Sequence, residues 1–346
     1  MNQKQRYMNV VIVHAAVTDD SAPDDRDVLD QVDAVSAGLK GLGHTVTVLP
    51  CHLDLAGVKS RLLAVRPRVV FNLVESLDGC MRLIHLFPAL LEAMALPYTG
   101  SCAEALWVTT HKGMAKAKIS AAGLPTPPWV LADEGHDTVH DRPSRLETNT
   151  IRKPWIIKSL WEHASVGLDE DRIVSMESFQ ELSDRLQKIF IETGDPCFAE
   201  AYIDGREFNL SVLGGPGGPQ VLSPAEIVFE GYADEKPKIV GYKAKWEPGS
   251  WEYHHTPRSF DFPDTDQSLL NTLNDLALSC WKIFGLKGYA RIDFRVDSKG
   301  RPWILEVNAN PCLSPDAGFS AALKRSGISF IEAIGRILAD ALRRGF

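Results

Sequence analysis

Short apolar stretches alternate with amphipathic ones along the first hundred or so residues. "NVVIVHAAV" predicts a buried strand, Asp27 to Leu42 an amphipathic helix ended by Gly43, and "HTVTVLP" a second strand. A further strand is predicted within "RPRVVFNLVES" and a helix within "LIHLFPALLEAMALPYTG". Strands that alternate with helices favour a parallel sheet flanked by helices.

The pattern changes in the rest of the chain. A Lys-rich helix is predicted from Thr109 to Ala122, followed by the proline-rich linker "GLPTPPW". "PWIIKSL" predicts a strand and "RIVSMESFQELSDRLQKIF" a helix, with Asp133 to Asn149 as a surface loop. Beyond them, short strands with glycine-bearing turns predict an antiparallel sheet: "EFNLSVLGG", "QVLSPAEIVF", "GYARIDFRVD" and "PWILEVN". We therefore expect an α/β (α+β) protein with three domains, at residues 1–105, 106–198 and 199–346.

Composition and charge exclude several classes of protein. A chain of 346 residues with 45% hydrophobic residues can bury a large core, and the net charge of −8 disfavours binding to nucleic acid or to an anionic membrane surface. The six cysteines are scattered without a CxxC pair, so they suggest neither a structural zinc site nor a disulfide framework, and they fit a reducing cytoplasm. The first apolar run is too short for a signal peptide or a membrane span, so we expect a cytoplasmic protein.

The stretch "GYARIDFRVDSKGRPWILEVNANP" predicts two strands joined by a turn at residues 297–300. If the loop is even-numbered and centred on Ser298 and Lys299, Arg291 lies opposite Glu306 and Asp293 lies opposite Ile304. Strand side chains alternate between faces, so one face would carry Arg291, Asp293, Glu306 and Asn308. The other would be apolar and would carry Ile292, Phe294, Val296, Trp303, Leu305 and Val307.

Two carboxylates and an amide oxygen on one face are suitable ligands for magnesium, a hard cation. A carboxylate on a half-buried strand needs a partner, because burying it unpaired is costly. An ion pair between Arg291 and Glu306 is an alternative that needs no metal. It would not require Asp293 or Asn308.

These motifs resemble those of the D-alanine–D-alanine ligase branch of the ATP-grasp superfamily. The matching stretches run in the family's order from about Val69 to Pro311: "ALPYTG", "HKGMAKAKISAAGLPTPPW", "EAYIDGREFNLSVLG", "GYARIDF" and "ILEVNANP". The resemblance implies a three-domain ATP-grasp fold, with ATP clamped between the central and C-terminal domains and two Mg²⁺ ions, which Mn²⁺ can replace. It also implies ADP-forming ligation of small molecules, in which ATP phosphorylates a carboxylate and an amine attacks the acyl phosphate. The sequence leaves the choice between a monomer and a homodimer open.

By this resemblance, Asp293, Glu306 and Asn308 are magnesium ligands, and Glu306 bridges both ions. Arg291 matches the arginine that stabilises the oxyanion of the tetrahedral intermediate. Such a site agrees with the chemistry, because phosphoryl transfer depends mainly on positioning and charge neutralisation.

The resemblance also implies nucleotide contacts. Lys112 and Lys158 match lysines that contact the ATP phosphates, and a lysine that follows an apolar strand, as Lys158 does, needs an anion. Glu200 matches the acid that binds the adenine amino group, Ala201 and Ile203 offer backbone contacts, and Glu207 matches the ribose-binding acid. Taken alone, Lys112 or Lys158 could be a surface lysine, and Glu200 or Glu207 a solvated acid at a strand end.

Two loops are similar to the family's closing loops. "EHASVG", residues 162–167, takes the place of a Gly-Ser-Ser loop that covers the phosphates; Ser165 matches, while His163 and Ala164 replace the glycine and the first serine. "GYKAKWEPG" resembles the mobile loop over the active site, with Lys245 in the place of the lysine that reaches the transferred phosphate. An exposed Lys-rich loop is the alternative interpretation.

The substrate end departs from the family. The family's N-terminal Glu-and-Ser stretch is not found in "VHAAVTDDSAPDD", its His-Gly loop is replaced by "NLVESLDGCMR", and Ala317 stands where it has a serine. We therefore expect an altered amino acid or amine substrate, with candidate contacts at His14, Glu75, Asp78 and Asp316.

The alternatives are a strict D-alanine–D-alanine ligase of peptidoglycan synthesis and a noncatalytic ATP-binding module. Retention of Arg291 favours an enzyme, since a pure ATP binder has less need of it. A Rossmann dehydrogenase is disfavoured, because no GxGxxG follows the first strand.

Overall fold

The computed structural model describes residues 7–18, 20–131, 151, 153–161, 165 and 167–343. The loop expected over Asp133 to Asn149 lies outside the described residues. So do Glu162 to Ala164 and Val166 of the expected phosphate loop. Among the helices that are described, none combines the length and the apolar character needed to cross a membrane.

The N-terminal part contains a parallel three-stranded sheet, as predicted, in the order β2-β1-β3. The strands are β1 (Asn9–Ala15), β2 (Thr45–Cys51) and β3 (Val69–Leu73). Alternate residues of β1 pack on opposite faces: Val10 and Ile12 share a core with α1 (Pro23–Gly41), whereas Val11 and Val13 share one with α2 (Leu55–Val65) and α3 (Leu86–Ala93).

A four-stranded antiparallel sheet forms the central part, in the order β4-β7-β5-β6. Its strands are β4 (Trp129–Leu131), β5 (Trp155–Ser159), β6 (Ile173–Val174) and β7 (Cys197–Ala201). The amphipathic helix α6 (Phe179–Thr193) covers the sheet; Ser178 caps its start and Gly194, at φ 74°, ends it. The expected domain limit between residues 198 and 199 falls within β7.

The C-terminal part contains a mainly antiparallel sheet of six strands, in the order β11-β10-β8-β12-β13 with β9 beside β8. The strands are β8 (Gly205–Leu213), β9 (Gln220–Val221), β10 (Ala225–Ile227), β11 (Arg258–Ser259), β12 (Tyr289–Asp297) and β13 (Pro302–Asn308). One face packs on α4 (Ala103–Thr110), α5 (Lys112–Ala121) and α9 (Gln267–Ile283). The other face is the floor of the site described below.

The Lys-rich helix expected from Thr109 to Ala122 is α5, which begins at Lys112; Thr109 and Thr110 belong to α4, a separate helix that was not predicted. The break lies at His111, whose backbone is extended and whose Nδ1 accepts a hydrogen bond from the Met114 N–H at 3.0 Å. A cap at this position ends α4, and it places Lys112 at the first residue of α5.

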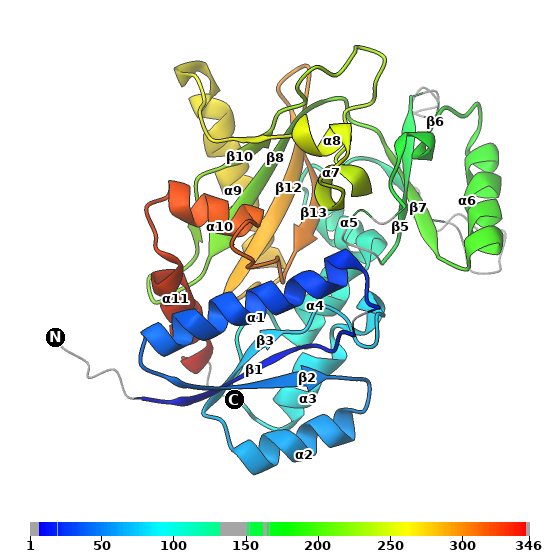
Figure 1. Cartoon of the computed structure of the whole chain (residues 1–346). Coiled ribbons are helices and arrows are strands. Elements are labelled where there is room, and N and C mark those ends of the chain that lie inside the picture. The colour runs from blue at the N-terminus through cyan, green and yellow to red at the C-terminus, as the bar shows by residue number, and fades with distance from the viewer. Residues whose placement is uncertain are drawn as a thin grey trace.

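The last two helices, α10 (Gly318–Arg325) and α11 (Phe330–Leu342), return to the N-terminal sheet (Figure 1). Their apolar residues share one core with β1, β3 and α1. The four-stranded sheet and α6, on the right of Figure 1, have a separate core. In the view of Figure 1, two short helices lie between the six-stranded sheet and the four-stranded sheet: α7 (Tyr242–Trp246) and α8 (Trp251–His254).

Candidate active site

The β12–β13 hairpin places its polar residues on one face, but not in the expected register. Asp293 lies opposite Glu306, and Arg291 lies opposite Asn308. The turn is odd-numbered, with Asp297 bonded to Arg301 and Gly300 at φ 73°, and the register shifts between Asp293 and Phe294. This bulge turns Ile304 into the core. Our expected apolar face was therefore wrong at two positions, since Trp303 and Leu305 are not part of that core.

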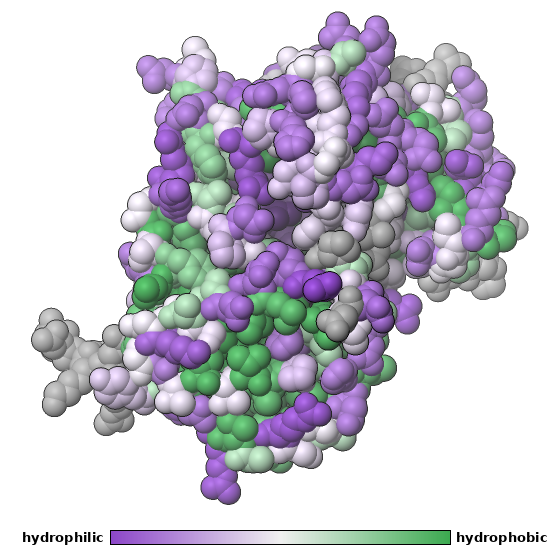
Figure 2. All heavy atoms as spheres, in the orientation of Figure 1, coloured by the Kyte–Doolittle hydropathy of each residue, from purple (hydrophilic) through white to green (hydrophobic). Residues whose placement is uncertain are grey.

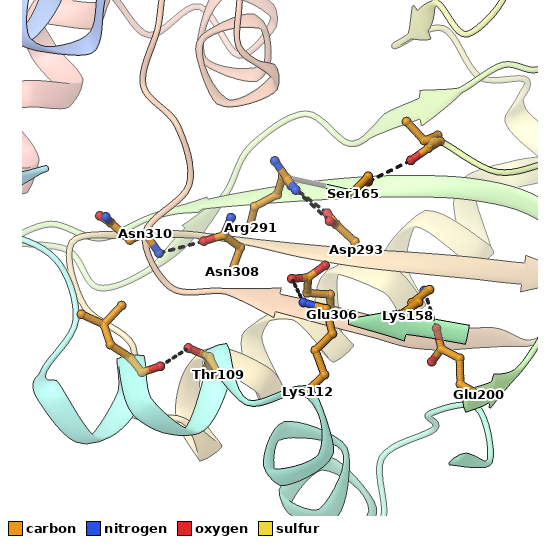
Figure 3. Close-up of polar contacts among 12 residues, drawn as sticks. Thr109, Lys112, Lys158, Ser165, Glu200, Arg291, Asp293, Glu306, Asn308 and Asn310 are labelled. Atoms are coloured by element: carbon orange, nitrogen blue, oxygen red, sulfur yellow. Dashed lines mark hydrogen bonds and ion pairs between the residues drawn. The ribbon is translucent and has the colours of Figure 1, made fainter. Parts of the chain in front are cut away.

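Arg291 and Asp293 form a bidentate ion pair, with Nε and Nη2 each 2.8 Å from a carboxylate oxygen (Figure 3). Asn209 of β8 donates to the same carboxylate at 2.9 Å. Burial lowers the pKa of Arg291, but the charge and hydrogen bonds of Asp293 outweigh it, so this pKa is raised and the arginine stays charged. The alternative pairing of Arg291 with Glu306 is wrong, because the arginine pairs with Asp293.

Glu306 instead contacts Lys112, whose Nζ lies 3.2 Å from Oε1 (Figure 3). Lys112 is the first residue of α5, and its side chain is almost fully buried. A lysine buried to this extent needs anionic neighbours. The start of α5 therefore places a cation directly over the acidic face of the hairpin.

The third expected metal ligand, Asn308, accepts from the Asn310 N–H at 3.0 Å through Oδ1. Asn310 is itself held by Tyr289 and by the Val74 carbonyl. Within the described ranges, no three His, Cys, Asp or Glu side chains are grouped to hold a metal. The carboxylates of Asp293 and Glu306 and the side-chain amide of Asn308 lie at neighbouring positions of the hairpin. Each can offer an oxygen atom, which is the kind of ligand that Mg²⁺ takes.

Glu200 lies at the other end of the site and is fully buried between two lysines. Lys158 of β5 contacts one carboxylate oxygen and Lys116 of α5 the other. Burial raises the pKa of Glu200, but the two lysines lower it by more, so the carboxylate is ionised. The sequence analysis missed Lys116, although its spacing of four residues from Lys112 puts both on one helix face.

The segment after Glu200 lines the same cleft. Ala201 donates its N–H to the Pro128 carbonyl at 2.8 Å, so this N–H does not serve the backbone contact expected of it. The Ile203 N–H has no hydrogen bond within the described chain. Glu207 pairs with Arg295 at 2.8 Å; Arg295 was also missed, although it alternates on β12 with Arg291 and Asp293.

Lys245 reaches the hairpin from α7. Burial lowers its pKa, Arg291 lowers it further, and Glu306 and Asp293 partly compensate. Nearby, Ser165 donates to the Val240 carbonyl at 3.0 Å, so the start of the α7–α8 segment contacts the central part of the chain. Lys112, Lys158 and Lys245 therefore approach one cleft from three different elements.

This cleft encloses about 860 Å³ of open space, including the part continuous with solvent. Figure 2 shows a recessed, mainly hydrophilic area between the region of α1 and that of α8. Most of the expected nucleotide and metal residues line the cleft: Lys112, Lys158, Ser165, Glu200, Ala201, Ile203, Glu207, Lys245, Asp293 and Glu306.

The four expected substrate residues divide into two groups. His14 is buried against the Ala15 carbonyl, and Asp78 turns to His52 and to the Leu53 N–H, so neither lines the cleft. Glu75 accepts from Gln31 at 2.9 Å, and its charge acts on Cys312. Asp316 lies beside Arg258, which is close enough to Arg291 for their charges to repel. Neither Glu75 nor Asp316 lines the cleft either, so none of the four expected substrate residues does.

Comparison with known proteins agrees with this geometry. The family model described as the D-Ala–D-Ala ligase C-terminus matches residues 119–339, more than half of the chain. A D-alanine–D-alanine ligase of Carboxydothermus hydrogenoformans is 32% identical over 72% of this chain and 74% of its own. The chain belongs to the D-alanine–D-alanine ligase family. It is an ATP-grasp ligase of the ADP-forming, carbon–nitrogen bond-forming kind.

Other relatives of this ligase-family member cover nearly the whole chain. The D-alanine–D-alanine ligase of Moorella thermoacetica is 31% identical over 89% of this chain and 92% of its own, and an uncharacterised protein of Sinorhizobium fredii is 28% identical over 91% and 88%. The crystal structure of the Bacillus anthracis ligase complexed with ATP aligns with a TM-score of 0.72, at 19% identity, over 97% of this chain and 98% of its own. This likeness confirms the predicted fold.

Proposed function

We propose that this ligase activates the carboxylate of one small molecule with ATP and joins it to the amine of a second, which is an amino acid or amine other than D-alanine. The observation that carries the ATP chemistry is the approach of Lys112, Lys158 and Lys245 to the cleft from three elements. Cations that converge in this way are suited to a polyphosphate. ATP and a divalent metal ion serve this family; a pair of Mg²⁺ ions is part of our proposal.

In the proposed arrangement, the adenine end of ATP lies between Glu200 and the Ile203 N–H, and Glu207 contacts the ribose. The phosphates lie along Lys158 and Lys112, towards Lys245. Asp293, Glu306 and Asn308 would hold Mg²⁺, which when bound neutralises charge that develops on the phosphates. Closure of Ser165 over Val240 would exclude water from the transferred group.

The first step transfers the γ-phosphoryl group to a carboxylate oxygen of the substrate and releases ADP. The amine of the second substrate then attacks the carbonyl carbon of the acyl phosphate, the carbonyl oxygen takes up negative charge, and phosphate leaves as the amide forms. Arg291, fixed by Asp293, would stabilise that oxyanion. The amine loses its proton in the same step, and the departing phosphate accepts it.

The departure from D-alanine rests on the substrate end of the site. Ala317, which precedes α10, offers no side-chain hydroxyl, and no side-chain cap bond is made there. A site built to pair a substrate's polar groups loses discrimination when one of those partners changes.

A screen of D- and L-amino acids, amines and hydroxy acids for ATP-dependent phosphate release, with products identified by mass, tests this proposal. We expect little release with D-alanine alone and strong release with a different amino acid or amine. Robust formation of D-alanyl-D-alanine would contradict the altered substrate. If none of the compounds in the screen causes phosphate release, a noncatalytic module would be favoured.

The six cysteines are all free, which fits the cytoplasmic location that we also propose.

A further inference from the structure

Arg258 of β11 lies on the same face of the six-stranded sheet as the catalytic candidates. It is directly opposite Ile227 of β10, which is opposite Glu207 of β8, which is opposite Arg295 of β12. Directly paired residues of an antiparallel sheet project to one side, so the Arg258 side chain points to the side of Arg291 and Asp293. The sequence analysis did not single out this residue.

The side chain of Arg258 extends to the start of α10. Its Nη1 donates to the Asp316 carbonyl at 3.0 Å. A Cβ added to Gly318 would lie 3.6 Å from its Nε, so the guanidinium lies directly against this glycine. Arg258 therefore lies beside Ala317, the position at which the family's serine is absent.

No carboxylate of the described chain forms an ion pair with Arg258. The residue as a whole is exposed, although its guanidinium lies against the start of α10. Partial burial lowers the pKa of Arg258, the charge of Arg291 lowers it further, and Asp316 compensates only in part. Two guanidinium groups that repel each other, one of them without an acid partner, are stabilised by an anion bound between them.

Two acidic residues, Asp27 and Glu75, lie near Cys312. Glu75 and Asp27 both act electrostatically on this cysteine, as do Arg258 and Arg291. Asp27 accepts from Cys312 Sγ at 2.9 Å and from Ser314 Oγ at 2.8 Å, which fixes its position. Charges of both signs are therefore present around Cys312, and an amino acid likewise carries both a carboxylate and an ammonium.

We propose that Arg258 binds the free carboxylate of the amine-bearing substrate, in place of the hydroxyl that Ala317 lacks. This rests on the proposed ligation, and it makes the second substrate an amino acid rather than a simple amine. Arginine can hold a carboxylate through two parallel N–H donors, which a serine hydroxyl cannot. The dipeptide-like product accordingly keeps a free carboxylate.

The test compares free amino acids with their primary amides as the amine-bearing substrate, because the amide lacks only the charge that Arg258 recognises. ATP-dependent phosphate release is measured with wild type, Arg258→Ala, Arg258→Lys and Arg325→Ala. Arg325 is the matched control: it lies at the far end of α10 in an exposed pair with Asp261. Calorimetric binding of a nonhydrolysable ATP analogue with Mg²⁺ is measured on each protein.

We expect wild type and Arg325→Ala to prefer the acid over its amide at least tenfold in kcat/KM. Arg258→Ala should lose most of this preference through a higher KM for the acid, and Arg258→Lys should keep part of it, while all bind the ATP analogue equally. An acid-to-amide ratio unchanged in Arg258→Ala overturns the inference, as does a wild type that binds the analogue but turns over neither acids nor amides. Failure of wild type to bind the analogue overturns the proposed function instead.

Discussion

Asp297 holds the turn that sets the geometry of the β12–β13 hairpin. Its carboxylate accepts from the Lys299 and Arg301 N–H groups, from the Arg301 guanidinium and from Trp303 Nε1. Burial raises the pKa of Asp297, but these bonds lower it by more, from 3.8 to about 2. A carboxyl whose folded pKa is depressed contributes stability above its unfolded pKa, and this is lost as the pH falls through the folded value.

Asp297→Asn should therefore lower the free energy of unfolding near pH 7 by up to about 2 kcal/mol, and the difference from wild type should shrink between pH 5 and pH 3. Urea unfolding of both proteins across this range measures it. A difference independent of pH would show that shape, rather than charge, makes the contribution of Asp297.

Arg291→Ala tests the proposed role of Arg291 on the oxyanion. The transition state should lose about 3 kcal/mol of stabilisation, so the rate should fall accordingly, whereas ATP affinity should change less. Asn209→Ala is the matched control, because it removes the other partner of Asp293 and keeps the arginine. Steady-state kinetics and analogue binding separate the two effects; equal losses of rate and affinity would mean that Arg291 serves as a structural partner of Asp293.

At the scale of single residues, the motifs named residues that the fold brings together, while the roles expected of them stay predictions. Glu200, Lys158, Asp293 and Glu306 all line the cleft as expected. Lys116 was missed because its partner, Glu200, lies far away in sequence and only folding brings the two together. Arg258 carries no local signal, because its face depends on the register of three strand pairs.

At the scale of elements, alternation and turn residues predicted the strands, but not their register. One extra residue in the β12–β13 hairpin moved Ile304 inward, and no residue type in "PWILEV" marks a bulge. The start of the Lys-rich helix at Lys112 rather than Thr109 was missed for a similar reason. A histidine is an uncommon cap, and only its bond to Met114 shows that it ends one helix and starts the next.

The α7–α8 segment is held to the central part of the chain by Lys236. Its Nζ lies 2.8 Å from Glu252 and 3.1 Å from Glu170, and it lies over the Trp251 ring. Gly241 approaches the Leu168 carbonyl so closely that a Cβ would be 2.4 Å from it. These contacts join two parts of the chain across the cleft mouth, so we expect them to favour the closed form.

Lys236→Gln should lower the free energy needed to open this segment by about 0.5–1 kcal/mol, because partly exposed ion pairs contribute little more than this to stability. Chymotryptic cleavage near Tyr242 and Trp246 should then be about two- to fivefold faster than in wild type, and an ATP analogue with Mg²⁺ should slow it. Lys188→Gln is the control, because Lys188 forms an exposed pair with Glu192 on α6. Cleavage that is no faster in Lys236→Gln than in this control would contradict a role in closure.

At the scale of the whole molecule, the two sides of the cleft belong to different hydrophobic cores. The N-terminal sheet shares one core with α10 and α11, so it is joined to the C-terminal part. The four-stranded sheet and α6 have a core of their own. The order of strands and helices predicted a parallel sheet followed by an antiparallel one, but the sharing of a core between the two ends of the chain depends on contacts that no local pattern reports.

The central claim is that ATP binds in this cleft with a divalent metal on the hairpin. Calorimetric titration with a nonhydrolysable ATP analogue, with and without Mg²⁺, tests it most directly. We expect binding that Mg²⁺ strengthens in wild type, and that Mg²⁺ strengthens far less in Glu306→Gln, which keeps the shape of the side chain but removes its charge. Absence of binding to the wild-type protein with Mg²⁺ present would contradict the account.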